Sequence, residues 1–93
     1  STISTSELYQ SNDEIGEHIS EQLDGKKVVI GGIINSKKNK ITKNNNLMAF
    51  ITLEDLYGTV ECIVFPQIYD KYNELIEENN IVVIEGKLST NEE

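Results

Sequence analysis

The hydrophobic pattern of the chain changes at residue 25. Residues 1–24 are polar, acidic and weakly patterned, and we interpret them as a linker or partly helical lead-in. Within them, Asp13 is placed to cap a short helix towards Glu21, with Ile15 and Ile19 four positions apart. From residue 25 onwards, short β-branched and apolar runs alternate with turn signals, so residues 25–93 are predicted to form the folded domain.

Three strands are predicted over residues 26–34, 47–55 and 59–65. The first contains the adjacent Gly31 and Gly32, and paired glycines inside a strand suggest a bulge or sharp bend. Between the second and third strands, Asp55 and Gly58 occupy the first and fourth positions of a type I turn. These two strands are therefore predicted to form a hairpin.

A helix and a fourth strand are predicted after the hairpin. Pro66 suits the start of a helix, because its missing N–H costs nothing there. Residues 67–78 then place apolar side chains at helical spacing, namely Ile68, Tyr69, Tyr72, Leu75 and Ile76. Asn79 and Asn80 are expected to end the helix, since Asn tolerates left-handed backbone. Residues 81–89 are predicted to form the fourth strand.

The order strand, strand, strand, helix, strand predicts a mostly β fold, the small Greek-key barrel called the OB-fold, with one helix between its third and fourth strands. The alternative is a generic antiparallel sheet with one packed helix. The chain ends at "STNEE", where a fifth strand would follow, so the expectation is a fragment whose last strand is missing. An unpaired edge would then favour a homodimer or a distorted opening.

Composition narrows the functional classes. The chain has 93 residues, enough for one small domain, with 38% hydrophobic residues and a single cysteine and histidine. One Cys and one His make neither an internal disulfide nor a zinc site, and no nucleophile–base pair or phosphate-cradling glycine loop is present. We therefore expect no cofactor and no catalysis. The lone cysteine and the absence of a long apolar run fit a cytoplasmic protein without membrane contact.

Charge is segregated along the chain. The formal net charge is −8, which argues against unselective nucleic-acid binding by the whole surface. Residues 25–53, however, hold six lysines and no carboxylate, a charge of +6, whereas the other residues hold two lysines and sixteen carboxylates, a charge of −14. An acidic body of this kind can repel nucleic acid everywhere except along one basic arm.

Several short segments of the sequence, taken in order and with their spacings, resemble those of a known protein family. "VVIGGII", "ITK" followed by "MAFITLEDLYG", "VECIVFP" and "IVVIEGKLS" resemble the OB domain of the bacterial DNA polymerase III alpha subunit. The likeness covers residues 25–89. It implies a module that binds single-stranded DNA template within a DNA-directed DNA polymerase, a nucleotidyltransferase whose catalytic acids lie in other domains. Where relatives carry a loop glycine this chain has Asn45, which also tolerates positive φ.

Candidate binding residues follow from strand alternation and from the lysine cluster. The predicted outer face carries Phe50 and Thr52 on the second strand and Glu61 and Ile63 on the third, with Phe50 as a base-stacking residue. The segment 35–46 is expected to be the loop between strands one and two. The phosphate-binding candidates are Lys37, Lys38, Lys40 and Lys43, with Lys87 as an extension of the path. The alternatives are a Phe50 packed under the lysines or inside, and lysines that only solvate a loop.

Two rival functions remain open at this point. One is a protein-interaction module that docks other replisome subunits through its strand edge or acidic helix face, which the overall acidity favours. The other is the anticodon-binding domain of an aminoacyl-tRNA synthetase, because the outer "F-x-x-L-x-D" pattern resembles that of such domains. The lysine cluster favours the primary prediction, single-stranded nucleic-acid binding.

Overall fold

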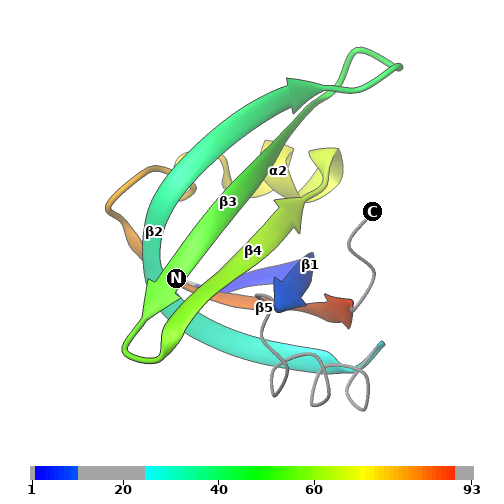
Figure 1. Cartoon of the computed structure of the whole chain (residues 1–93). Helices are drawn as coiled ribbons and strands as arrows, with labels where there is room; N and C mark the ends of the chain where they lie inside the picture. Colours follow the sequence, from blue (N-terminus) through cyan, green and yellow to red (C-terminus); the bar gives the residue numbers. More distant parts are fainter. Residues whose placement is uncertain (1, 11–24, 90–93) are drawn as a thin grey trace.

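The computed structural model describes residues 2–10 and 25–89, which form a closed five-stranded barrel with one short helix. The strands run around the barrel in the order β1-β4-β3-β2-β5, and α2 packs against β3 and β1 (Figure 1). None of the described residues forms a helix that is long and apolar enough to cross a membrane. The elements are β1 (Thr2–Gln10), β2 (Lys27–Ile41), β3 (Leu47–Asp55), β4 (Gly58–Val64), α2 (Pro66–Tyr72) and β5 (Ile81–Ser89).

The long strand β2 bends and pairs with a different neighbour on each side of the bend. Its first half pairs with β5 and its second half with β3, and Ile33 is opposite residues of both. At Gly32 an added Cβ would lie 2.7 Å from the carbonyl oxygen of Glu54, so only glycine permits this approach of β2 to β3. The register shifts between Ile34 and Ser36, as in a β-bulge. The predicted bend is therefore confirmed.

The connection between β2 and β3 is shorter than the sequence indicated. β2 continues to Ile41, so only residues 42–46 form the loop, and the expectation of a loop over 35–46 was wrong. Two backbone hydrogen bonds close it: Thr42 N–H donates to the Asn46 carbonyl (2.8 Å) and Asn45 N–H to the Thr42 carbonyl (2.9 Å). Asn45 has φ +68°, so asparagine does occupy a left-handed position there.

The β3–β4 hairpin turns where it was predicted to turn. Asp55 is paired with Gly58, leaving a two-residue tip, and its Oδ1 accepts hydrogen bonds from the backbone N–H of Tyr57 (2.8 Å) and of Gly58 (3.1 Å). A carboxylate that accepts from the turn's own backbone stabilises the tip. The hairpin therefore fixes the register of β3 against β4, which decides which side chains share a face.

The helix α2 ends at Tyr72, six residues before the predicted end. Residues beyond it form turns, with Leu75 N–H donating to the Tyr72 carbonyl (2.8 Å) and Ile76 N–H to the Asn73 carbonyl (3.2 Å). Ile76 is nevertheless fully buried. The apolar spacing thus correctly identified residues that face the core, but the last of them reach the core from turns and not from a helix. These turns end at Asn79, which has φ +74°.

The barrel is closed by β1, which the sequence analysis did not foresee. β1 pairs antiparallel with β4 and parallel with β5, so the expected unpaired edge between these strands is occupied. The interpretation of residues 1–24 as a lead-in outside the barrel was therefore wrong for Thr2–Gln10, and the basis for a homodimer through an open edge is removed. The short helix expected over 13–21 lies outside the described residues.

The remaining order β2, β3, β4, α2, β5 is the predicted OB-fold order, with the helix between the third and fourth of these strands, and is confirmed. Strand alternation agrees with this for five of the six predicted inward residues of β3 and β4, which are buried, while the sixth, Val60, is half-buried. The buried core consists of Ile34, Ala49, Ile51, Leu53, Cys62, Val64, Tyr69, Ile76, Val82, Ile84 and Leu88.

Candidate functional site

The outer face of β2, β3 and β4 carries two rows of side chains that run across the three strands. In one row, Phe50 on β3 lies opposite Lys38 on β2 and Ile63 on β4. In the other, Thr52 lies opposite Ser36 and Glu61. Directly opposed residues have Cβ atoms about 4.5–5.5 Å apart, so each row is a continuous surface. Four of the predicted site residues, Phe50, Thr52, Glu61 and Ile63, therefore meet on one face.

Phe50 presents an accessible ring in the first row. Its exposed fraction is 36%, against 2% or less for its inward neighbours Ala49 and Ile51. Ile63 is half-buried beside it, so the ring is supported from one side by an aliphatic side chain. An exposed aromatic ring on a rigid strand offers a flat apolar surface to another planar ring.

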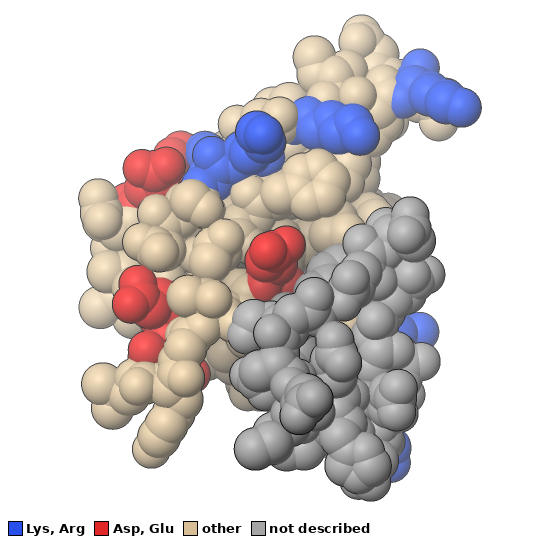
Figure 2. Space-filling model, viewed as in Figure 1, with Lys and Arg blue, Asp and Glu red and all other residues tan. Residues whose placement is uncertain are grey.

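Lysines border this face on the β2 side. We call residues 36–50 the arm; it comprises the second half of β2, the loop and the first half of β3. Lys38 and Lys40 lie on β2 opposite Phe50 and Met48, and Lys43 lies in the loop, all three exposed. Figure 2 shows lysine side chains along the arm, while acidic side chains gather on the rest of this face. The arm thus gives this face a positively charged border.

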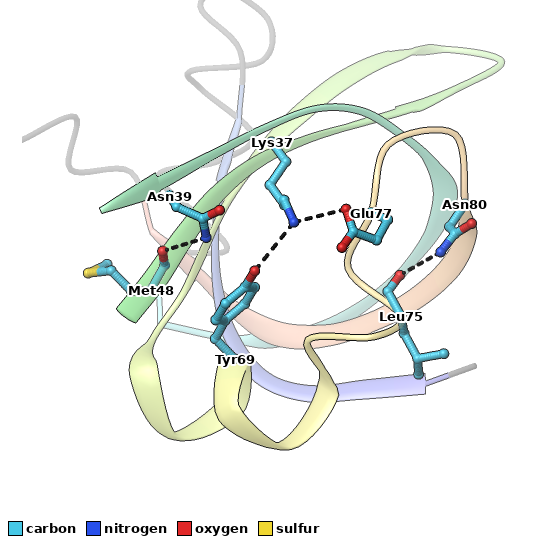
Figure 3. Close-up of polar contacts among 7 residues, drawn as sticks. All are labelled: Lys37, Asn39, Met48, Tyr69, Leu75, Glu77 and Asn80. Atoms are coloured by element: carbon cyan, nitrogen blue, oxygen red, sulfur yellow. Dashed lines mark hydrogen bonds and ion pairs between the residues drawn. The ribbon is translucent and has the colours of Figure 1, made fainter. Parts of the chain in front are cut away.

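Lys37 differs from these three lysines. It is opposite Ile51, whose side chain points into the core, and its own side chain is only 15% exposed. Its Nζ donates to Glu77 Oε1 (2.9 Å) and to the Tyr69 hydroxyl (3.3 Å) and lies 5.8 Å from the Tyr69 ring centroid (Figure 3). The hydrogen bond to Glu77 is the main reason that the pKa of Lys37 is raised. The structure therefore separates Lys37 from the lysines of the outer face.

Lys87 also lies away from Phe50. It is on β5, which pairs with β1 and β2 but not with β3, and it is opposite Lys27 at the start of β2. Lys27 in turn lies 3.6 Å from Glu85. The separation between Lys27 and Lys38 is eleven residues of strand, about 36 Å of chain path at roughly 3.3 Å per residue. Lys87 thus belongs to a second basic group at the other end of β2.

A pocket of about 830 Å³ lies where the arm meets the helix, and the sequence analysis did not identify it. It is formed between the β2–β3 loop, the end of β4 and α2. Its residues come from segments that are distant in sequence, so no local motif signals it. The lining side chains include Asn46, Leu47, Phe65, Gln67, Tyr69 and Asp70.

The described residues outside the outer face include carboxylates and one thiol. In the part of the chain that the structure describes, no cluster of three or more His, Cys, Asp or Glu side chains is arranged to hold a metal ion. Cys62 is buried, and desolvation raises the pKa of its thiol to about 12. A thiol with so high a pKa is not a nucleophile near neutral pH.

Comparison with known proteins adds two findings. A family model described as an OB-fold nucleic acid binding domain, tRNA_anti-codon, matches residues 28–93. The DNA polymerase III subunit alpha of Aquifex aeolicus (strain VF5) is 47% identical over 60 residues, 64% of this chain and 5% of that protein. Those of Buchnera aphidicola subsp. Schizaphis graminum (strain Sg) and Escherichia coli (strain K12) are 36% and 31% identical, over 71% and 70% of the chain. The chain spans 5–6% of the length of these three relatives.

Proposed function

Because the chain belongs to the family of OB-fold nucleic acid binding domains, we propose that the outer face of β2, β3 and β4 binds single-stranded DNA. One observation carries this proposal: the row in which exposed Phe50 stands between a lysine, Lys38, and an aliphatic side chain, Ile63. Stacking on the ring is worth about 1–3 kcal/mol per base, and it holds the base whatever its identity. The lysine beside it supplies the charge that a phosphate requires.

Each outer-face residue has a role in this proposal. A base stacks on Phe50, and the backbone phosphates run along the arm past Lys38, Lys40 and Lys43. Thr52 offers a hydroxyl that donates or accepts, and Glu61 accepts a hydrogen bond from a base amino group. The negative charge of Glu61 keeps phosphates on the lysine border. Lys37 does not contact phosphate in this proposal. It stabilises the arm on the helix side through its hydrogen bonds to Tyr69 and Glu77.

The names of the relatives support a proposal about the larger protein to which this domain belongs. They are named DNA polymerase III subunit alpha, so we infer that the domain belongs to a replicative DNA polymerase acting in the cytoplasm and holds single-stranded template near its active site. On this proposal the domain contributes binding, and the nucleotidyl transfer is performed by other parts of the polymerase.

Fluorescence anisotropy with labelled single-stranded DNA and RNA at two salt concentrations tests the proposal. Three phosphate contacts should give a log–log salt slope of about −2 for a single strand. Phe50→Ala should weaken binding, whereas Tyr57→Ala, an equally aromatic change at the hairpin tip, should not. Tyr57 is 95% exposed and lies outside both rows. An oligonucleotide affinity that does not change with salt concentration, or that Phe50→Ala does not lower, would refute this assignment.

A second candidate function, a protein-interaction module, is favoured by a separate observation. Val29 and Ile81 are 64% and 78% exposed, and Ile81 is opposite Ile33, itself 37% exposed. These apolar side chains lie on β2 and β5, away from Phe50, and exposed apolar patches mark contact surfaces for other proteins. No oligonucleotide binding at low salt would favour this function, with other replisome subunits as partners. Tighter binding of RNA than DNA would instead favour anticodon recognition.

A further inference from the structure

The pocket between the arm and α2 has the chemistry of a base-binding site and not of a phosphate site. None of its lining residues is basic, and Asp70 brings a carboxylate to it. A phosphate would be repelled by this carboxylate and would meet no basic lining residue. Phe65, in contrast, is 39% exposed and offers an aromatic surface, while Asn46 and Gln67 offer amide groups that both donate and accept. Its volume of about 830 Å³ is within the usual range of about 300–1,000 Å³ for small-ligand sites.

The walls of the pocket are held in place before any ligand arrives. Phe65 is extended, precedes the proline that starts α2, and its carbonyl accepts from the Tyr69 N–H (2.8 Å). Tyr69 is 7% exposed, and its hydroxyl accepts a hydrogen bond from Lys37 (Figure 3). On the opposite side, Asn46 accepts from Thr42 in the closed loop. A preformed pocket needs little ordering on binding, which favours affinity.

The pocket borders the outer face at Phe65. Phe65 follows Ile63 by two residues in extended backbone, so both side chains lie on the same side of the sheet. Asn46 follows Lys43 by three residues in the β2–β3 loop. A strand whose phosphates passed Lys38, Lys40 and Lys43 would therefore reach the pocket at the end of the arm, where a base turned away from the phosphates could enter.

We propose that this pocket holds one unpaired base of the bound strand, stacked against Phe65, and that Asp70 makes guanine the preferred base. This deepens the proposed function and rests on it. Asp70 is exposed and lines the pocket, and the two oxygens of its carboxylate are acceptors only. Guanine is the base that presents two adjacent donors, N1–H and the exocyclic amino group, and so matches a carboxylate in a bidentate pair.

The test uses oligo(dT) of about ten nucleotides, a length typical of sites on such folds. One thymine is replaced by guanine, or by hypoxanthine, which keeps N1–H but lacks the amino group, at each position in turn. At one position guanine should bind about fivefold or more tighter than thymine, with hypoxanthine between them. Asp70→Asn should reduce the preference for guanine over hypoxanthine and over thymine, because a single amide oxygen replaces the two acceptor oxygens of the carboxylate.

Matched variants distinguish an effect of the pocket on base preference from an effect of net charge or of impaired folding. Glu74→Gln removes the same charge from an exposed residue just after α2 that does not line the pocket, and it should leave the guanine preference intact. Phe65→Leu keeps an apolar side chain but removes the ring, and it should weaken binding of the guanine oligonucleotide without lowering Tm.

The outcomes distinguish this inference from the function on which it rests. If no oligonucleotide binds, the proposed function itself fails. If oligonucleotides bind and Phe50→Ala weakens them, but guanine, hypoxanthine and thymine bind equally at every position, the pocket proposal is overturned. It is also overturned if Glu74→Gln and Asp70→Asn have the same effect on the guanine preference.

Discussion

Lys37 and Lys38 are adjacent in the sequence, yet they belong to two different regions of the molecule. Lys38 lies on the outer face beside exposed Phe50. Lys37 lies on the helix side, where it joins β2 to Tyr69 and Glu77 and is 15% exposed. The difference shows that alternation divides a cluster of like charges on a strand into two sets with different surroundings. One set is available to a ligand and the other holds the arm in place.

Replacing one aromatic residue in each region should give the largest effects. Tyr69→Ala should lower the free energy of unfolding by about 3–5 kcal/mol, because the ring is 7% exposed and its removal leaves a cavity. Phe50→Ala should change stability little but weaken oligonucleotide binding by about 1–3 kcal/mol. Urea denaturation and anisotropy measure the two quantities. Tyr69→Phe, which removes only the hydroxyl, provides the milder control, and equal stability losses in Tyr69→Ala and Phe50→Ala would contradict the comparison.

Substitutions of Lys37 and Lys38 should likewise affect different quantities, stability and binding respectively, with smaller effects. Lys37→Met should lower the free energy of unfolding by about 1 kcal/mol, since its partner Glu77 is 56% exposed and water screens part of the ion pair. Lys38→Met should leave stability unchanged and reduce the salt slope of binding by about 0.7, the value of one phosphate contact. If the salt slope responds to Lys37→Met instead, the assignment of the two lysines is reversed.

The stabilisation by Lys37 should also depend on pH. Its pKa is raised above the ordinary 10.5, chiefly by the hydrogen bond to Glu77, so the folded state binds this proton more tightly than the unfolded chain does. The stabilisation is therefore fully present below 10.5 and is lost as the pH rises through the folded-state pKa. The stability difference between wild type and Lys37→Met should be constant between about pH 7 and 10 and shrink above that range. Denaturation curves of both proteins across this range check the sign, and a difference that grows with pH would contradict it.

The smallest effect is expected at Lys87. Because this residue lies at the other end of β2, Lys87→Ala should not alter the affinity for a short oligonucleotide that covers Phe50 and the arm. A strand long enough to follow β2 around its bend would meet the second basic group, and only then should the substitution reduce the salt slope, by about 0.7. Titrations with oligonucleotides of increasing length measure this, and an effect on the shortest one would place Lys87 within the main site.

The inside and outside of the barrel could be predicted from the sequence because they depend on local periodicity. Alternation in β3 and β4 assigned Ala49 and Cys62 inward and Phe50 and Glu61 outward, and the structure agrees. The different fates of Lys37 and Lys38 could not be predicted, because a bulge between Ile34 and Ser36 reverses the alternation of β2. The two glycines indicated a bend but not the position of the shift.

Long-range contacts were the other feature that the sequence did not disclose. Residues 67–78 carry a helical spacing of apolar side chains, but Asn73 ends α2 and donates a side-chain hydrogen bond to the Asp70 carbonyl. Neither the partners of Lys37 nor the pocket beside Phe65 is encoded locally, since each unites segments about twenty to forty residues apart. β1 was missed because its few apolar residues give it no strand-like alternation over residues 2–10.

The closure of the barrel by β1 has a consequence for the order in which the chain folds. Thr2 is opposite Val83, so the pairing of β1 with β5 joins residues that are far apart in the sequence. The β3–β4 hairpin, in contrast, forms across a two-residue tip. Since contacts of high sequence separation form slowly, the hairpin and its neighbours should assemble first and β1 should dock last. The amides of β1 should then exchange with solvent earliest, and the native barrel should open first along the pairing of β1 with β4 and β5.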